Sequence, residues 1–511
     1  MKQKIRRLFC CCLAVCQLFT ITALGQPDWP SDTGIQAEIG IVIDADSGAV
    51  LFGQNIHVPS PPASITKLLT ALVVVEHCEL DETVTFSQEA ISNVEPDSGD
   101  KLHLVAGDTM TVEDALHAML LLSVNQVANG LAEHVAGSMP EFVDLMNQKI
   151  GELGCTESHF DNPSGLNGDT QNVTAYDMAL IARAAFANED VLRISSTVNY
   201  QTGPTANNPN GCSLRNEHRF LYTTDSNSAN YYPYAVAGKT GYLLKAGNTL
   251  VTYAEKDGRH LICVILKGSY EHYFQDTKTL LEFGFNRFQN IYIADQEQSY
   301  VTGDSPMTFG EYTFQPSELM IEAGRVVTLP NGASLTDATL TLEELPDGRS
   351  EELPAAAVAQ LSYHYNDRNV GNAFLLVKNP PEGFGQEPET ESDAEPSTAA
   401  TEPDGETTPA PEKEGGFFSS LKLPELKLPS LPKLPSGTAL VITVVVLLVG
   451  LNAALVAFIS YRRKKEAEAL ARRRERRRQR LMEAGEQEEF DRLMAERAAR
   501  LHKKGNGSDK P

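Results

Sequence analysis

The sequence lacks the patterns that hold catalytic or structural metals. It contains no His-Glu-x-x-His segment, and half of its eight cysteines fall among residues 1–16. The other four are too far apart in the chain for a local zinc motif: Cys78, Cys155, Cys212 and Cys263. We therefore expect no metal and no other cofactor. Disulfides among these four are compatible with an oxidising compartment but cannot be paired from the sequence, and Cys263, within HLICVILK, is expected as a buried free thiol.

Basic residues are scarce over most of the chain. The net charge is −25, and between residues 26 and 461 the 58 acidic residues far outnumber the 22 basic ones. A surface of this sign repels a phosphate backbone, so the composition argues against nucleic acid as a ligand. The arginine-rich stretch at 472–480 is interleaved with glutamate, which favours a solvated helix near anionic lipid over an RNA-binding arm.

Charge is also missing from a long apolar segment near each end. Four basic residues precede the first, which covers 8–24 and ends in small residues typical of a signal-peptide cleavage site. The second, at 437–460, spans a hydrocarbon core of roughly 30 Å at about 1.5 Å per residue. Basic residues follow it at once, so the positive-inside rule predicts a single-pass membrane protein with its C-terminus in the cytoplasm.

Hydropathy periodicity predicts the secondary structure between these segments. Alternation over 37–55 and over 248–268 predicts two β-hairpins, the second turning at Asp257-Gly258. Apolar spacings of three and four predict helices within four segments before the second hairpin and one after it: 68–75, 112–135, 142–153, 175–186 and 271–284. A chain that begins in a sheet, inserts helices and returns to a sheet predicts one α/β domain with a helical lobe.

The composition after this domain changes twice. Short strand signals punctuated by LPNG and LPDG predict a small all-β domain, and a Pro-, Glu- and Thr-rich stretch beyond it predicts disorder followed by an extended stalk. The expected parts, in chain order, are a signal peptide (1–25), the α/β domain (35–290), the small β domain (295–378), the disordered linker and stalk (380–436), the transmembrane helix (437–461) and a basic cytoplasmic tail (462–511).

The segment PPASITKLLTALVVVE places Ser64 three residues before Lys67 at the start of an apolar helix. Serine at such a position is often only a helix cap. The spacing of one helical turn also puts the hydroxyl and the amine on the same face, where a deprotonated lysine can activate a serine nucleophile. The same spacing recurs at Ser98 and Lys101 in a polar turn, and twice in the stalk, where no helix is expected to align the two side chains.

Polar groups in two other segments complete a possible site. Ser123 and Asn125 interrupt the apolar run LLLSVNQVANGLAEHVAG, and buried polar groups cost stability unless they are paired, which favours a functional use. Lys239, in VAGKTGY at the start of a predicted strand, is a second cation that would lower the pKa of a neighbouring lysine and bind an anionic substrate end. A single lysine is more often a solvated surface residue. Each motif alone is weak, and the three in this order are specific.

With these motifs the sequence resembles the low-molecular-mass penicillin-binding proteins, which are serine-type D-alanyl-D-alanine carboxypeptidases of the penicillin-recognising fold, similar to peptidase family S11. The likeness extends in detail over about 35–290, through IVIDADSGAVLFGQN, PASITKLLTA, SHFDNPSGL and GKTG, and more loosely over 295–378. It implies a β-lactamase/transpeptidase-like domain with an antiparallel sheet flanked by helices. It also implies a bacterial cell membrane protein whose catalytic domain lies outside the cytoplasm.

The resemblance also implies roles for the motif residues. Ser64 would attack the D-Ala-D-Ala bond of a peptidoglycan stem peptide, with Lys67 as general base, Ser123 as proton relay and Asn125 orienting the substrate. The backbone N–H groups of Ser64 and Tyr242 would hold the oxyanion. β-Lactams would acylate Ser64 as covalent inhibitors. The residues expected to bind substrate are Lys239, Thr240, Gly241 and Tyr242.

Three positions depart from the family pattern and bear on substrate preference: Gln126, Leu243 and Tyr273. Two alternatives remain open. A β-lactamase needs a carboxylate to drive deacylation, for which Asp161 and Asp169 in HFDNPSGLNGD are conceivable, although both are expected as turn residues. A membrane-anchored sensor of β-lactams or peptidoglycan would instead signal through the cytoplasmic tail.

Overall fold

The described part of the chain lies within one compact unit, Met1–Ala394. The computed structural model describes residues 27–95, 98–99, 101–345, 353–381 and 384. The predicted signal peptide, transmembrane helix and cytoplasmic tail, and nearly all of the predicted linker, lie outside these residues. Within them, no helix combines the length and the apolar character that crossing a membrane requires.

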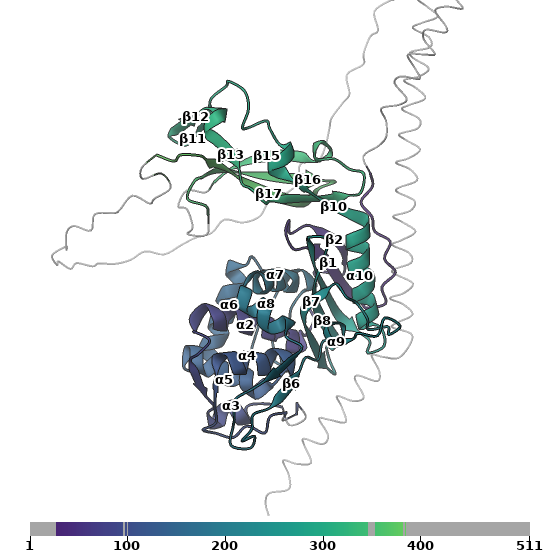
Figure 1. The fold of residues 1–511 in the computed structure, drawn as a ribbon, viewed down its shortest axis with the longest axis vertical. Helices are drawn as coiled ribbons and strands as arrows, with labels where there is room; N and C mark the ends of the chain where they lie inside the picture. Colours follow the sequence, from purple (N-terminus) through teal and green to yellow (C-terminus); the bar gives the residue numbers. More distant parts are fainter. Residues whose placement is uncertain (1–26, 96–97, 100, 346–352, 382–383, 385–511) are drawn as a thin grey trace, which may run out of the picture. The chain divides into compact units, whose positions relative to one another are not determined.

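A five-stranded antiparallel sheet forms the centre of the first domain (Figure 1). Its strand order places the N-terminal hairpin beside strands that come some two hundred residues later in the chain. In spatial order the strands are β2 (Val50–Gln54), β1 (Ile39–Asp44), β9 (Arg259–Gly268), β8 (Gly247–Lys256) and β7 (Ala235–Leu243). Both predicted hairpins are confirmed. Asp257 and Gly258 both have positive φ, as a two-residue type I′ turn requires.

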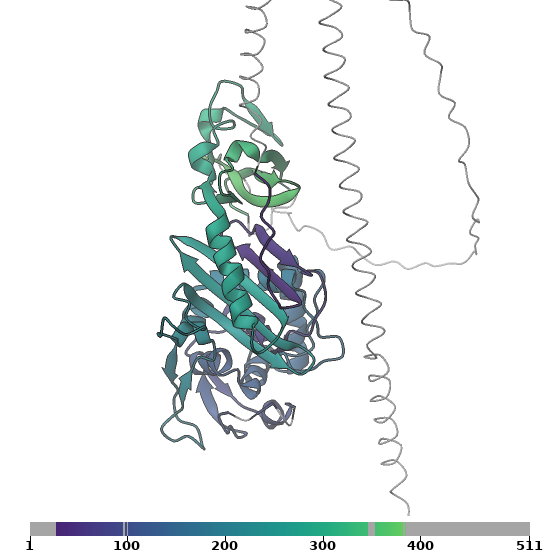
Figure 2. The same ribbon diagram turned by 90° about the vertical axis from the view of Figure 1, so that its right-hand side faces the viewer.

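The two faces of the sheet are covered by different helices. Successive strand residues point to opposite faces, so Ile41 and Val264 pack into the helical lobe while Val42 and Cys263 pack against α10 (Tyr273–Arg287). Figure 2 shows α10 lying across the sheet. The predicted helix over 271–284 corresponds to α10, and Cys263 is the buried free thiol that the sequence predicted.

The helical lobe contains three of the predicted helices nearly unchanged and one that is broken. The predicted helix over 112–135 is wrong as a continuous element: α4 ends at Leu121, α5 starts at Asn125, and Ser123 between them has φ +61°. The lobe and its connections consist of η1 (Ala63–Thr66), α2 (Lys67–His77), β3 (Thr83–Thr85), α3 (Gln88–Ser92), β4 (Thr109–Thr111), α4 (Val112–Leu121), α5 (Asn125–Ala136), α6 (Met139–Glu152), α7 (Ala175–Ala187), α8 (Glu189–Ser196), β5 (Asn199–Gln201), β6 (Ser213–Arg215) and α9 (Arg219–Tyr222).

Strands follow α10 and enclose a separate apolar core. Its main sheet has the order β13-β17-β16-β15, and β10 pairs with β14, so the strand-rich part begins at Phe288, before the predicted boundary at 295. The elements are β10 (Phe288–Tyr292), α11 (Ile293–Gln296), β11 (Met307–Phe309), β12 (Tyr312–Phe314), η2 (Pro316–Glu318), β13 (Leu319–Ile321), β14 (Val326–Pro330), η3 (Leu335–Asp337), β15 (Thr339–Glu344), β16 (Ala357–Tyr365) and β17 (Arg368–Val377).

Candidate active site

Ser64 does not cap a helix. It lies inside the short 3-10 turn η1, whose N-cap is Pro62 and which has no side-chain cap. Lys67 begins α2 directly after this turn, and its Nζ lies 3.0 Å from Ser64 Oγ. The predicted alignment of hydroxyl and amine is therefore present.

The backbone before Ser64 is held in an uncommon conformation. Ala63 has φ +54°, which costs a non-glycine residue free energy and is found mainly where the surroundings enforce it. Thr249 Oγ1 donates to the Pro62 carbonyl at 2.9 Å and ties the turn to β8. Gly165 approaches from the other side so closely that a Cβ there would lie 1.9 Å from the Ala63 carbonyl oxygen. These contacts fix the direction of the Ser64 side chain.

Lys67 is fully buried, and its amine has three neighbours. Besides Ser64 Oγ, these are Asn125 Oδ1 at 2.8 Å and the Ser164 carbonyl at 2.5 Å. Burial lowers the pKa of Lys67 well below its usual range, and the positive charge of Lys239 lowers it further. A neutral amine has two N–H groups and one lone pair. Because the two carbonyl oxygens only accept, the lone pair of the neutral form would face the Ser64 hydroxyl.

Lys239 is the second buried lysine of the site. Its Nζ donates to Ser123 Oγ at 3.1 Å and to the Thr240 carbonyl at 2.8 Å. Burial lowers the pKa of Lys239 to about 8, so it holds its proton near neutral pH. Ser123 reaches this contact from the break between α4 and α5, where its left-handed backbone turns the side chain toward β7. Lys239 lies within β7 rather than at its start.

Strand β7 runs directly beside the serine. At Gly241 a Cβ would lie 2.9 Å from the Ser64 backbone nitrogen and 2.4 Å from Thr249 Oγ1, so this approach requires glycine. Thr240 and Tyr242 flank Gly241 and line the cleft, and Tyr242 is 62% exposed. The strand thus brings its backbone next to the N–H of Ser64, where two amide groups can face one oxygen atom.

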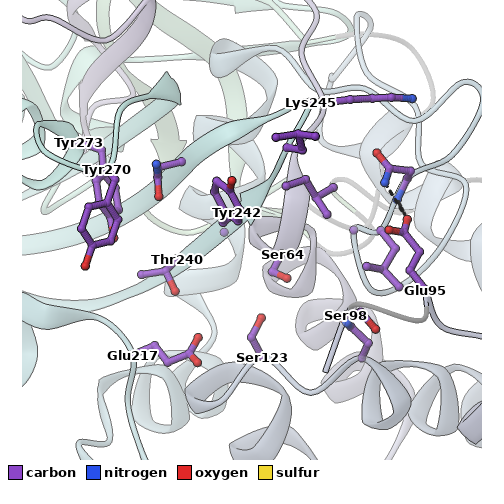
Figure 3. Close-up of a pocket in the computed structure, with 18 of the residues that line it drawn as sticks. Ser64, Glu95, Ser98, Ser123, Glu217, Thr240, Tyr242, Lys245, Tyr270 and Tyr273 are labelled. Atoms are coloured by element: carbon purple, nitrogen blue, oxygen red, sulfur yellow. Dashed lines mark hydrogen bonds between the residues drawn. The ribbon is translucent and has the colours of Figure 1, made fainter. Parts of the chain in front are cut away.

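A cleft of about 1010 Å³ opens over these residues (Figure 3). The predicted residues that line it are Ser64, Ser123, Asn125, Thr240, Gly241 and Tyr242. Lys67 and Lys239 lie beneath the surface, where they contact Ser64 and Ser123. The structure therefore brings all the predicted site residues together, from η1, α2, the α4–α5 break, the start of α5 and β7.

The cleft also has charged residues that no sequence pattern assigned to it. Lys101 Nζ lies 2.6 Å from Glu217 Oε1, and the Arg219 guanidinium carbon lies 4.8 Å from the centre of the Tyr270 ring. Ser98 lines the cleft too, so the second Ser-x-x-Lys pair lies beside the site. As expected for a turn, its side chains are not aligned, and Lys101 contacts Glu217 and not Ser98. Glu217 and Arg219 lie in a polar segment with no periodic pattern, so nothing in the sequence indicated that they line the cleft.

The three departures from the family pattern lie in or beside the cleft. Leu243 and Tyr273 line it, and Gln126 is buried, with no hydrogen-bond partner for its Oε1 among the described residues. The two acidic residues considered for deacylation do not line it. Asp161 accepts from the backbone of Thr170 and Gln171 as a turn residue does, and Asp169 lines a neighbouring hollow.

The fold and this site define a serine hydrolase of the β-lactamase/transpeptidase-like class. Residues 26–269 match the family model of Peptidase_S11, D-alanyl-D-alanine carboxypeptidase. The chain is 34% identical over 265 residues to D-alanyl-D-alanine carboxypeptidase DacB2 of Mycobacterium tuberculosis, covering 51% of this chain and 84% of that protein. It is 30% identical over 276 residues to D-alanyl-D-alanine carboxypeptidase DacF of Bacillus subtilis, covering 53% and 67%. The chain belongs to the peptidase S11 family, which confirms the resemblance.

The fold is shared with solved penicillin-binding proteins. The crystal structure of penicillin binding protein 5 from Haemophilus influenzae matches with a TM-score of 0.53 at 23% identity, over 68% of this chain and 98% of that chain. The α/β fold expected from the sequence is thus confirmed.

Proposed function

We propose that the protein is a serine-type D-alanyl-D-alanine carboxypeptidase that removes the terminal D-alanine from peptidoglycan stem pentapeptides and is inhibited by β-lactams. The observation that carries this proposal is the buried Lys67 amine, which lies 3.0 Å from Ser64 Oγ and contacts two carbonyl oxygens; in its neutral form these contacts leave the lone pair for the hydroxyl. Membership of the S11 family supports the substrate class.

In the proposed acylation step, Ser64 Oγ forms a bond to the carbonyl carbon of the D-Ala-D-Ala peptide while its proton passes to Lys67 Nζ. The negative charge that develops on the carbonyl oxygen is held by the N–H groups of Ser64 and Tyr242. In other enzymes one such donor contributes about 2.7–4 kcal/mol to the transition state. The close approach of β7 to Ser64 supports this assignment.

Collapse of the tetrahedral intermediate breaks the C–N bond and requires a proton on the leaving amine. Ser123 accepts a hydrogen bond from Lys239, so its own O–H proton is available to the departing nitrogen. The proton that Lys67 took from Ser64 replaces it, which returns Lys67 to its neutral form. Asn125 holds Lys67 and orients the substrate amide. Water then attacks the acyl carbon while Lys67 takes a proton from it. The bond to Ser64 Oγ breaks, and Lys67 returns the proton to that oxygen.

The terminal carboxylate of the substrate needs a positive partner. Lys239 and Thr240 are the proposed contacts, and Arg219 adds a second cation on the same cleft. The guanidinium is held against Tyr270, so it is partly ordered before substrate binds. The family that the sequence resembles commonly has an arginine before the last helix, around Tyr273 in this chain, and we propose that Arg219 supplies this charge.

The test is release of D-alanine by the purified full chain from a pentapeptide ending in D-Ala-D-Ala. A matched peptide ending in L-alanine is the control, because the stereochemistry decides which face of the carbonyl meets Ser64. Release from the first peptide only, with a long-lived covalent penicillin adduct, is expected. No release would reject the proposal, and rapid turnover of penicillin would identify a β-lactamase instead.

We further propose that the enzyme is exported and anchored, with residues 1–25 as signal peptide, 437–461 as membrane span and 462–511 in the bacterial cytoplasm. The charge-free segment 437–460 and the basic residues after it support this assignment. Deleting 437–461 is expected to release the protein from the membrane fraction of cells. Full retention of the deletion variant in that fraction would contradict the proposed span.

A further inference from the structure

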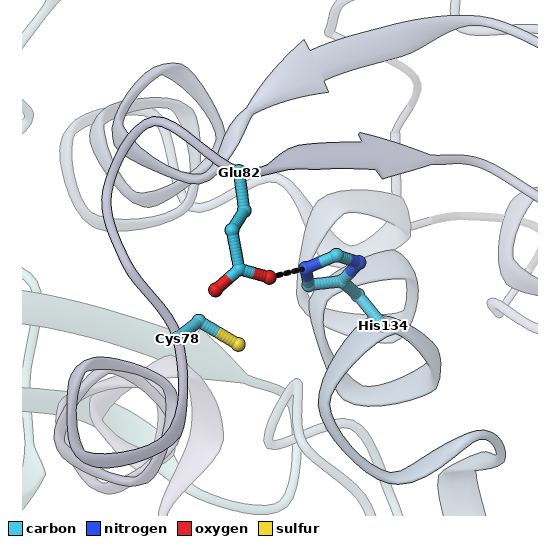
Figure 4. A group of neighbouring side chains, drawn as sticks. All are labelled: Cys78, Glu82 and His134. Atoms are coloured by element: carbon cyan, nitrogen blue, oxygen red, sulfur yellow. Dashed lines mark hydrogen bonds and ion pairs between the residues drawn. The ribbon is translucent and has the colours of Figure 1, made fainter.

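Three side chains capable of binding a metal meet away from the cleft (Figure 4). Cys78 directly follows α2, Glu82 directly precedes β3, and His134 lies in the last turn of α5. One ligand atom from each lies within 4.8 Å of the other two, and His134 Nε2 is 3.0 Å from Glu82 Oε2. Because three separate elements converge, the cluster is a tertiary feature.

The chemistry of these groups selects among cations. Sulfur, imidazole nitrogen and carboxylate oxygen are the ligands of zinc, whereas calcium and magnesium prefer oxygen alone. In a tetrahedral site with bonds of about 2.0–2.3 Å, neighbouring ligand atoms lie about 3.3–3.8 Å apart. A pair of ligand atoms at the upper limit of 4.8 Å therefore needs to approach by about 1.0–1.5 Å, within reach of side-chain rotation.

The groups around the thiol favour a cation. The Glu82 carboxylate and a His134 ring nitrogen both lie within 4.8 Å of Cys78 Sγ, so an anionic oxygen and an imidazole nitrogen accompany the sulfur. Glu82 is already oriented, since its Oε1 accepts from the Glu79 backbone N–H at 2.7 Å.

We propose that Cys78, Glu82 and His134 bind a zinc ion, with water as a fourth ligand. The site joins the ends of two helices whose other ends contribute to the cleft, since α2 begins at Lys67 and α5 at Asn125. At about 1.5 Å per residue the metal lies some 16 Å along α2 from Lys67. It stabilises the helix pair and takes no part in the chemistry. Without a metal, the same residues form only a partly exposed His-Glu pair, which contributes little stability.

The first test measures zinc bound to the chelator-treated full chain after addition of zinc chloride. Cys78→Ser and His134→Gln are each compared with Cys212→Ser, which changes the other half-buried free thiol. We expect the parent and Cys212→Ser to bind one zinc ion that Cys78→Ser and His134→Gln do not bind. At a hundredfold excess over Kd, zinc should raise the melting temperature of the parent and of Cys212→Ser by about 5 °C. Equal zinc binding and equal thermal shifts in all variants would overturn the proposal.

A second measurement needs no variant and remains decisive if the substitutions impair folding. The full chain is alkylated with and without zinc, and modification of each cysteine is mapped by mass spectrometry. Zinc is expected to slow alkylation of Cys78 at least tenfold and to leave that of Cys212 unchanged. Unchanged alkylation of Cys78 at saturating zinc would contradict the site.

Discussion

Two Ser-x-x-Lys pairs lie beside the same cleft, and they differ in every property that matters for chemistry. Lys67 is fully buried and its amine lies 3.0 Å from Ser64 Oγ. The Lys101 side chain is 39% exposed, and its amine contacts Glu217 in place of Ser98. An ammonium group paired with a carboxylate has no lone pair to offer a hydroxyl. The comparison teaches that burial and a fixed helical turn, more than the spacing itself, decide which pair is reactive.

The largest expected effect is on the rate of acylation, which should depend on Lys67 and hardly at all on Lys101. Lys67→Met removes the proposed base while keeping a long apolar side chain, so acylation by a labelled penicillin should slow by about a thousandfold. Lys101→Met removes an exposed ion-pair partner and should change the rate less than tenfold. Stopped-flow or timed gel fluorescence measures both. Similar losses in the two variants would mean that the comparison is wrong.

A smaller effect is expected at Gly241, where a substitution tests how closely β7 must approach Ser64. An added methyl group would press on the Ser64 backbone nitrogen and on Thr249, and so would separate β7 from the reactive serine. We expect Gly241→Ala to lower kcat/KM for the pentapeptide by about a hundredfold, the size of a roughly 1 Å misplacement. Gly258→Ala, in the distant hairpin turn, controls for general destabilisation. Wild-type activity in Gly241→Ala would refute the close approach.

The third prediction concerns pH. Acylation should increase as Lys67 loses its proton, because the neutral amine is the base, and substrate binding should weaken above pH of about 8 as Lys239 loses its charge. The resulting alkaline decline in kcat/KM approaches tenfold per pH unit. In Lys239→Arg the guanidinium keeps its proton, so the decline should move to higher pH. If kcat/KM declined over the same alkaline pH range in this variant, Lys239 would not be the group whose charge binds the substrate.

Local patterns predicted much of the fold. The hairpin over 248–268 was predictable because Asp257-Gly258 favours the required turn, and α2, α6 and α7 were predictable from apolar periodicity. The break between α4 and α5 was not predictable from the sequence. The apolar spacing continues on both sides of it, and the left-handed conformation of Ser123 depends on tertiary packing.

The motif residues of the site were predictable and their charged neighbours were not. Ser64 and Lys67 are joined by a local spacing, whereas Lys101 and Glu217 are 116 residues apart and meet only in the folded chain. Cys78 and His134 are likewise distant in the sequence and come together only in the folded chain. Their separation excludes a local zinc motif, and only the meeting of α2 and α5 makes a metal site conceivable.

The most direct test of the central claim is to map the residue that a penicillin acylates. The full chain is treated with excess penicillin, digested and analysed by mass spectrometry, with Ser64→Ala as the matched variant. We predict an adduct on the peptide containing Ser64, none on the peptide containing Ser98, and none in the variant. An adduct at Ser98, or undiminished labelling of Ser64→Ala, would contradict the account.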